Sequence, residues 1–211
     1  MLLYIKIQMR NRLREFLIAS LRHSRSEMEI HMNTTDNLEQ FLPILRTASI
    51  FSGMSDSEIL SVLHCMGAFV SDKEKDSYLL RAGDMTSTMG LLLSGSAIVI
   101  QEDVWGHRNI MAQILPGQTF AEPFAASNGT ALNISVVVTK DCSLLYLDIH
   151  RILGVCPSAC EHHTHLIQNL ISVLAKKLLL FNEKITHMSK RTTKEKLLSY
   201  LSAEAQRQGS L

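Results

Sequence analysis

Apolar residues recur at helical spacing over a long stretch near the C-terminal end of the chain, from about Cys160 to Ser189. One row of them follows alternating steps of four and three, the spacing of a coiled-coil seam. It consists of Ile167, Ile171, Leu174, Leu178, Phe181, Ile185 and Met188. A second row widens the apolar face and consists of Leu166, Leu170, Val173 and Leu180. The pattern predicts a dimerisation helix over 158–189, with one row on a partner helix and the other on the preceding domain. The simpler alternative is an amphipathic helix that packs only on its own domain.

Residues 32–67 have the pattern of short helices. A periodic apolar stretch runs from Asn37 to Leu45. Further on, Ser55 is a favourable N-cap, and Glu58 three residues later completes a capping box. The apolar positions after this cap predict one buried helix face, formed by Ile59, Leu60, Leu63 and Met66.

The period changes to two from Ala68 onwards, and residues 68–150 predict a β domain. Turn signals rich in glycine separate the candidate strands. The strands are expected at 68–73, 77–81, 89–93, 96–102, 108–115, 134–139 and 143–148. Many short strands with such turns are typical of a jelly roll. The predicted fold class is therefore mainly β with flanking α: a jelly-roll (double-stranded β-helix) barrel followed by the long dimerisation helix.

The two ends of the chain differ from its centre. Residues 1–31 combine six basic residues with apolar positions at helical spacing. We interpret them as an N-terminal basic extension outside the fold, although a basic amphipathic helix on a membrane or nucleic acid has the same pattern. In 190–211, Thr192 and Glu195 predict a second capping box, and Gly209 is the expected helix stop. The apolar residues Leu197, Leu198 and Leu201 are expected to face inward.

Composition limits the class of protein. Of the 211 residues, 46% are hydrophobic and 19% charged, which indicates a folded globular chain. The net charge of +1 gives no overall field that would attract nucleic acid or a membrane. The longest apolar runs are too short to span a bilayer, so no membrane partner is expected. Four cysteines do not form a disulfide scaffold in a chain of this length, which favours a cytoplasmic location.

Three turn segments carry a family resemblance. Residues Tyr78–Asp84, Leu91–Ala97 and Ile114–Pro123 resemble, in order and spacing, the cyclic-nucleotide-binding barrel of the Crp/Fnr transcription regulators. The resemblance covers roughly residues 40–205. It implies a barrel that senses a small molecule, a long helix that forms a homodimer, and a helix-turn-helix that binds DNA. Residues 191–198 resemble the first helix of that DNA-binding module, and the helix-turn-helix itself is missing from this chain, so 190–211 is expected to be the start of a truncated domain.

The resemblance also identifies a candidate ligand pocket. In the family, a Gly-Glu turn followed about ten residues later by an Arg and a hydroxyl residue holds the cyclic phosphate and the ribose. Here Ala121 replaces the Gly, Glu122 is retained, and Leu132 and Asn133 stand where the Arg and the hydroxyl residue would be. The predicted pocket residues are Phe120, Ala121, Glu122, Pro123, Phe124, Leu132, Asn133 and Ile134.

No Lys or Arg lies between Arg108 and Lys140. A phosphate that enters a binding site loses its hydration, and only charged hydrogen-bond donors in the site can compensate for that loss. We therefore predict that the effector is an unknown small molecule, apolar or weakly polar, and not cyclic AMP or cyclic GMP held in the family's manner. The alternatives are a pocket filled by its own side chains, which leaves a pure dimerisation module, and a Glu122 that only caps the following turn.

A cluster of thiols and imidazoles precedes the long helix: Cys156, Cys160, His162, His163 and His165. These groups suit zinc, copper or an iron centre, so a metal cofactor is a further candidate, as is a thiol-redox response. The plainer interpretation is a capped helix start with solvated surface histidines. Cys65 and Cys142 lie in apolar periodic stretches and are expected to be buried.

A cupin-like enzyme is the remaining alternative, because jelly-roll barrels also carry metal-dependent chemistry. Such chemistry requires histidines and carboxylates that project into the barrel. Only His107 at a hairpin tip and His150 at the end of the last strand lie near it. The sequence therefore favours a regulator over an enzyme.

Overall fold

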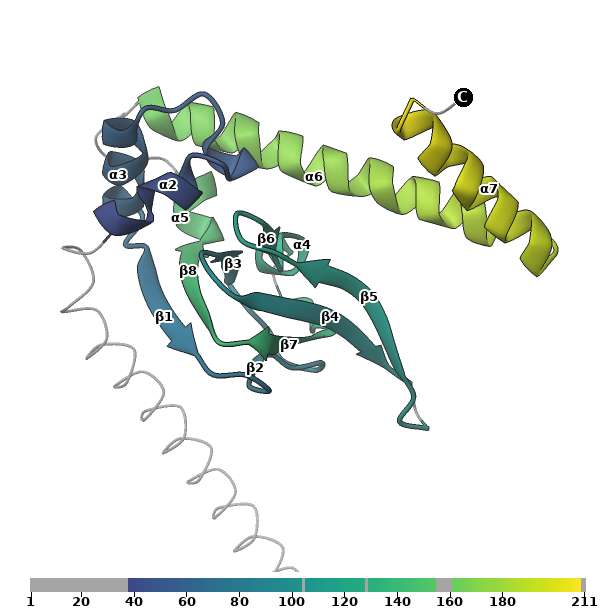
Figure 1. Ribbon diagram of the computed structural model, residues 1–211. Coiled ribbons are helices and arrows are strands. Elements are labelled where there is room, and N and C mark those ends of the chain that lie inside the picture. Colours follow the sequence, from purple (N-terminus) through teal and green to yellow (C-terminus); the bar gives the residue numbers. More distant parts are fainter. Residues whose placement is uncertain (1–37, 104, 128, 155–160, 210–211) are drawn as a thin grey trace, which may run out of the picture.

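The computed structural model describes residues 38–209 except 104, 128 and 155–160. Two antiparallel sheets form a β-roll, helices of the N-terminal part cover one of its ends, and the long helix α6 (Glu161–Met188) runs along it (Figure 1). The predicted fold class, mainly β with flanking helices, is confirmed. The predicted extension 1–31 lies outside the described residues.

The described N-terminal part consists of short helices. They are η2 (Glu39–Phe41), α2 (Leu42–Leu45), η3 (Ser49–Phe51) and α3 (Asp56–Cys65). The predicted capping box is confirmed, because the Glu58 backbone N–H donates to Ser55 Oγ and the Ser55 N–H donates to the Glu58 carboxylate. These bonds satisfy donors that the first helical turn leaves free.

Cys65 corrects one prediction. Its side chain is exposed, whereas Cys142 is buried as predicted. The buried residues Ile59, Val62 and Leu63 occupy one face of α3, and the helical period places Cys65 away from that face. A cysteine within an apolar periodic stretch is therefore not necessarily part of its buried row.

The strands form two four-stranded sheets in the orders β1-β8-β3-β6 and β2-β7-β4-β5. Their bounds are β1 Phe69–Lys73, β2 Tyr78–Leu80, β3 Thr88–Leu92, β4 Ser96–Glu102, β5 Arg108–Ile114, β6 Thr119–Phe120, β7 Ser135–Lys140 and β8 Cys142–Asp148. All seven expected strands are found. The two-residue strand β6 was not predicted, since two residues give no readable period.

Strand β8 is buried on both faces and separates two cores. Leu144 packs inside the roll with Leu92 and Val138. Leu145 and Leu147 point to the other side, toward the core that the helices form. This alternation follows from the two-residue period of a strand. One face of the sheet β1-β8-β3-β6 thus packs on the interior of the roll, and its other face packs on the helices.

Tyr146 on β8 stacks on Phe69, with the ring centroids 5.2 Å apart, and burial raises the pKa of its phenol to about 12. An unfolded tyrosine has a pKa of about 10. Between these values the folded chain retains a proton that the unfolded chain has lost, so this contribution to stability is complete below pH 10 and is lost as pH rises to 12. We expect Tyr146→Phe to reduce the alkaline loss of stability by up to about 2 kcal/mol. Urea unfolding at several pH values between 9 and 12 measures it. Equal pH slopes for the wild type and the variant would refute this assignment.

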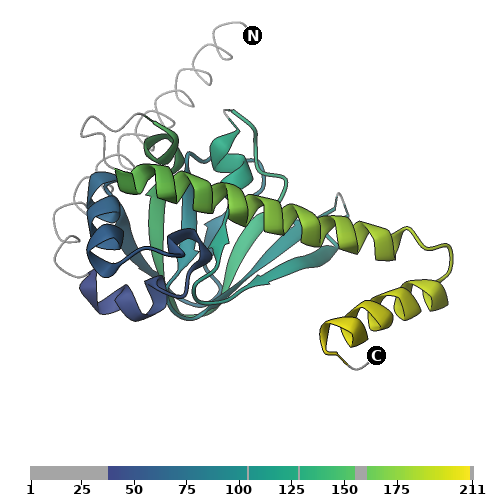
Figure 2. The same ribbon diagram turned by 90° about the horizontal axis from the view of Figure 1, so that it is seen from above.

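Helix α6 (Glu161–Met188) follows the short helix α5 (Ile149–Leu153) in the described chain and lies along the β-roll (Figure 2). The second predicted row packs on the domain as expected at Leu166, Leu170 and Val173, which are at most 7% exposed. Leu180 departs from this row and is 54% exposed, because the cavity described below separates this part of α6 from the roll.

The first predicted row of α6 is largely open to solvent. Ile171, Leu178, Ile185 and Met188 are 61–66% exposed, and Phe181 is 50% exposed. Ile167 and Leu174 are partly buried against the helical core. The simpler alternative, a helix that packs only on its own domain, does not explain these exposed side chains. Whether the row faces a second copy stays a prediction.

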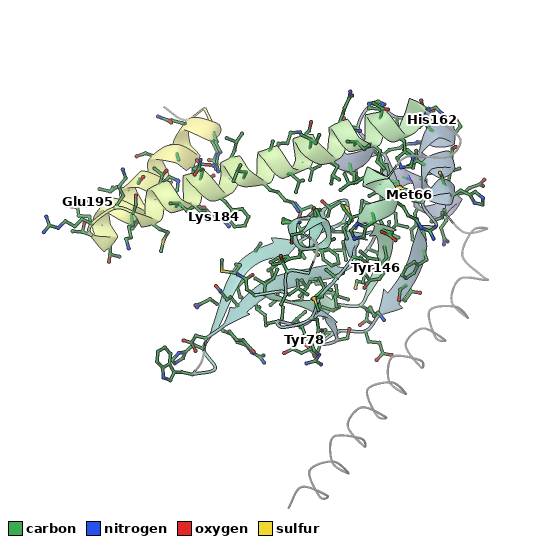
Figure 3. All side chains as sticks on the ribbon, turned by 180° about the vertical axis from the view of Figure 1, so that it is seen from behind. Met66, Tyr78, Tyr146, His162, Lys184 and Glu195 are labelled. Carbon is green, nitrogen blue, oxygen red and sulfur yellow. The ribbon has the colours of Figure 1, made fainter. Side chains whose placement is uncertain are left out.

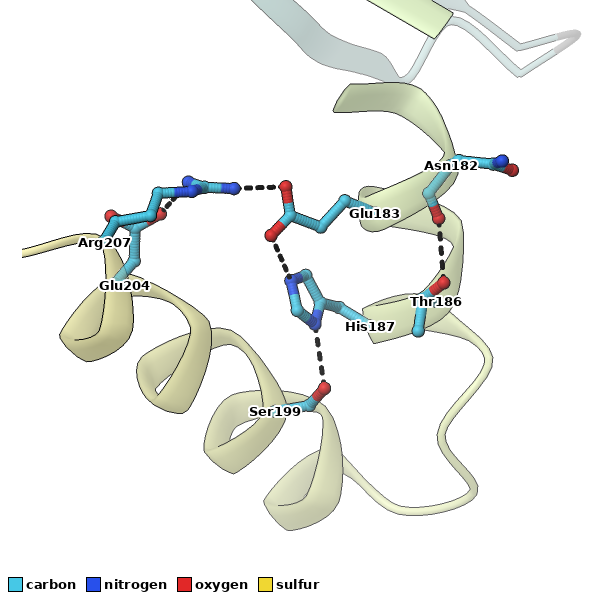
Figure 4. Close-up of polar contacts among 7 residues, drawn as sticks. All are labelled: Asn182, Glu183, Thr186, His187, Ser199, Glu204 and Arg207. Atoms are coloured by element: carbon cyan, nitrogen blue, oxygen red, sulfur yellow. Dashed lines mark hydrogen bonds and ion pairs between the residues drawn. The ribbon is translucent and has the colours of Figure 1, made fainter. Parts of the chain in front are cut away.

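Helix α7 (Thr193–Arg207) turns back beside the end of α6 (Figures 2 and 4). The capping box between Thr192 and Glu195 is confirmed, and the helix stops before Gly209. Side-chain contacts tie the two helices together: His187 Nδ1 lies 2.8 Å from Ser199 Oγ, and Glu183 pairs with Arg207 (Figure 4).

The prediction that the apolar residues of α7 face inward is wrong for this chain. Leu197, Leu198 and Leu201 are 51–57% exposed. The polar contacts of Ser199 and Arg207 hold α7 against α6 by a different face. The three leucines therefore form an apolar surface that the described part of the chain leaves about half exposed.

Candidate ligand cavity

The turn between β6 and the short helix α4 (Glu122–Ala126) forms one end of the candidate site. Ala121 adopts a left-handed conformation with φ of 67°. Glycine enters this region without steric cost, whereas an alanine there is strained. The backbone thus retains the conformation that suits a glycine, although its residue is alanine. Pro123 follows in the first turn of α4, where its missing N–H leaves no helical bond unmade.

Phe120 is fixed in this turn by close contact with the backbone of β3. Gly90 pairs with Phe120 on one side and with Tyr146 on the other. A Cβ atom built on Gly90 would lie 2.1 Å from the Phe120 ring. Only a glycine leaves room for the ring, which is 4% exposed and forms part of the cavity wall.

A cavity of about 710 Å³ lies between the β-roll and α6. Its size is within the range of small-molecule sites. Of the eight predicted pocket residues, the structure brings seven together in its lining: Phe120, Ala121, Glu122, Pro123, Phe124, Asn133 and Ile134. Leu132 does not line it. Its side chain is buried, and its backbone bonds to Gly83 and Asp84 hold it in a neighbouring turn. Ligand binding by these residues stays a prediction.

Glu122 is 1% exposed and pairs with a lysine of α6. Lys177 Nζ lies 2.6 Å from Glu122 Oε1 and donates a second bond of 2.6 Å to the Thr119 carbonyl oxygen. A buried carboxylate requires such a partner. The carboxylate therefore does more than cap its own turn: it joins the cavity turn to the long helix.

The cations of the cavity were missed from the sequence. The prediction considered only residues between Arg108 and Lys140, which contain no Lys or Arg. The structure adds Lys176, Lys177 and Lys184, which α6 supplies from a distant part of the chain. Lys184 Nζ lies 3.2 Å from the Met111 carbonyl oxygen on β5, so this side chain faces the roll (Figure 3). The sequence places Lys177 and Lys184 two helical turns apart, but this spacing does not reveal which part of the domain they face.

The predicted histidine–cysteine cluster is not brought together where the structure describes it. His162, which is labelled in Figure 3, pairs with Glu58. His163 Nε2 donates to the Arg151 carbonyl oxygen, and His165 lies against Gly53. Within the described parts of the chain, no group of three His, Cys, Asp or Glu side chains is arranged to hold a metal. Cys156 and Cys160 lie outside the described residues, so the metal and thiol alternatives stay predictions. His163 is 7% exposed, which corrects the expectation that these histidines are all solvated.

The histidine considered for enzyme chemistry at the hairpin tip has a local role. His107 Nδ1 lies 2.9 Å from Asp103 Oδ2, and this hydrogen bond is the largest influence that holds the pKa of Asp103 below its ordinary value. Asp103 also accepts backbone N–H bonds from Trp105 and His107. The pair thus stabilises the turn between β4 and β5 and lies on the surface.

Comparisons with known proteins agree with this architecture. Residues 72–158 match the family model of the cyclic nucleotide-binding domain. Comparison with curated protein sequences gives no match. The fold is similar to a cyclic nucleotide-binding domain from Methylobacillus flagellatus, with a TM-score of 0.62 and 16% identity over 75% of this chain and 88% of that one.

Two regulators are similar in fold as well. The catabolite activator protein of Thermus thermophilus has a TM-score of 0.58 and 20% identity, over 67% of this chain and 63% of its own. The sensor domain of the transcriptional regulator DNR from Pseudomonas aeruginosa has a TM-score of 0.51 and 15% identity, over 72% and 93%. The chain thus spans less than two thirds of the activator's length. These likenesses define the fold: the β-roll of the cyclic nucleotide-binding domains, flanked by helices.

None of the described helices combines the length and the apolar character that crossing a membrane requires.

Proposed function

We propose that this chain is the sensor and dimerisation part of a Crp/Fnr-type transcription regulator that acts as a cytoplasmic homodimer. The observation that carries the proposal is the bond between Lys177 of α6 and Glu122 of the cavity turn. It links the wall of a ligand-sized cavity to the helix whose apolar row is exposed. A ligand in the cavity contacts the roll and α6 together, and it would favour one arrangement of two paired helices over another.

The exposed leucines of α7 support the DNA-binding part of the proposal. A helix that presents Leu197, Leu198 and Leu201 to solvent has an apolar face suited to the core of a further module. In the proposed regulator, α7 is the first helix of the DNA-binding module, and the linker around Ser189–Thr192 transmits the arrangement of α6 to it.

The proposed effector is not cyclic AMP. The family's phosphate-binding Arg position is Leu132, which lies outside the cavity lining, and the retained Glu122 already pairs with Lys177. A cyclic nucleotide in the family's pose would find its ribose partner engaged and no guanidinium for its phosphate.

Calorimetry with cyclic AMP and cyclic GMP tests this part of the proposal. We expect no heat of specific binding, which corresponds to a dissociation constant above about 1 mM. The sodium salt of AMP serves as a control for nonspecific ionic heats. Micromolar binding of either cyclic nucleotide would refute the proposed effector class and leave the dimeric sensor intact.

A further inference from the structure

The cavity lining carries more positive than negative side chains. Three lysines and one glutamate line it, a net charge of +2. Lys177 is bonded to Glu122, whose charge it balances. Lys176 and Lys184 belong to the same face of the cavity, and no carboxylate of the lining remains to balance them. One wall of the cavity therefore carries excess positive charge, and that wall is α6.

The rest of the lining is mostly apolar. The roll contributes Val99, Met111, Ile114, Phe120, Ile134 and Val136. On the α6 side, Leu180 and Phe181 lie between the lysines in sequence and are about half exposed. The Lys184 ammonium lies 6.0 Å from the centre of the Phe181 ring, at the outer limit of a cation–π contact. An apolar body and a cationic rim thus occur in one cavity.

We infer that the cavity binds an amphiphilic anion, whose apolar body lies among the side chains of the roll and whose anionic group meets Lys176 and Lys184 on α6. The sequence predicted an apolar or weakly polar effector, because it did not show that the lysines of α6 line the cavity. This inference rests on the proposed sensor function and names its effector class. An apolar surface of this extent gains from contact with hydrocarbon or an aromatic ring. The lysines favour a carboxylate or a similar anion over a neutral or cationic head group.

Three probes with the same alkyl chain length separate the contribution of the apolar body from that of the charged group: octanoate, octan-1-ol and octylammonium. In calorimetric titrations of the whole chain at pH 7.5, we expect octanoate to bind about tenfold more tightly than octan-1-ol, as a charge-assisted contact implies. Octylammonium is expected to bind more weakly than the alcohol, because it meets like charge. Equal affinities for octanoate and octan-1-ol, tighter binding of octylammonium, or no binding of any probe would overturn the inference.

Variants locate the contact. Lys176→Gln with Lys184→Gln should weaken octanoate about five- to tenfold and leave octan-1-ol unchanged. Leu180→Glu places a carboxylate on the cavity wall at a half-exposed position, and should weaken octanoate more than octan-1-ol. Lys190→Gln is the matched control, since this exposed lysine follows α6 and does not line the cavity. Octanoate affinities that do not respond to the first two variants would contradict the assigned site.

Light scattering on the same samples keeps the inference separate from the proposed function. A dimer that shows no preference for octanoate refutes the effector class and leaves the dimeric sensor. A monomer that binds octanoate with the expected lysine dependence supports the effector class and refutes the dimeric sensor.

Discussion

Leu178→Lys combined with Ile185→Lys should convert the protein from a dimer to a monomer. Both residues lie in the first row of α6 and are 66% and 64% exposed in the single chain. In a helix pair they would be buried against the partner, and the two-fold symmetry would bring four new charges into one seam. We expect the dimer dissociation constant to rise at least about a thousandfold, on the order of 4 kcal/mol. Sedimentation equilibrium measures it.

The control for this prediction uses two exposed positions of the same helix that lie outside both apolar rows, Leu179 and Thr186. Leu179 is 68% exposed and is displaced about 100° around α6 from Leu178, as the helical period requires. Leu179→Lys with Thr186→Lys adds the same charges outside the seam and should leave the dimer intact. Leu174 is unsuitable as a test, because it also packs on the chain's own core. A dimer that survives the seam variant, or dissociates equally in both, would show that the interface lies elsewhere.

Lys177→Met should destabilise the folded chain by about 2–3 kcal/mol. It leaves the carboxylate of Glu122, which is 1% exposed, without its partner. Loss of one member of a buried pair costs about 3–5 kcal/mol, and the lower figure applies here because the Lys177 side chain is 36% exposed and water can reach the vacated position. Urea unfolding followed by circular dichroism measures the loss.

Two further variants separate the pair from general effects of the substitution. Lys176→Met removes the adjacent lysine, which also lines the cavity and is exposed, and should change stability by less than about 0.5 kcal/mol. Glu122→Gln together with Lys177→Met removes both charges and should recover about half of the loss. A double variant that is no more stable than Lys177→Met would mean that the two side chains do not interact.

The parts of the fold that depend on local sequence could be predicted. The capping boxes at Ser55 and Thr192 involve residues three apart, so the sequence contains the whole interaction. The strands were found because alternation of apolar residues persists over five to seven positions in most of them. The seven pocket residues around Glu122 were found through the family resemblance, because they lie in one short turn and in the residues just before β7, at the spacing of the family's binding motif.

The parts that depend on packing between distant segments could not be predicted. Lys177 is 55 residues from Glu122, and nothing in either local pattern pairs them. Leu197 is exposed because polar contacts orient α7 on α6. The apolar period of α7 does not predict those contacts. The same holds for Leu132, whose backbone bonds to a neighbouring turn place it outside the cavity.

The central claim is a dimer that carries its effector in the cavity beneath α6. Native mass spectrometry of the whole chain, purified without added ligand or chelator, tests it most directly. We expect a species of twice the chain's mass, with an additional small mass that is lost in the Lys176→Gln and Lys184→Gln double variant. A monomer at the bare chain mass would contradict the claim, and an added mass that a chelator removes would favour the metal alternative at the start of α6 instead.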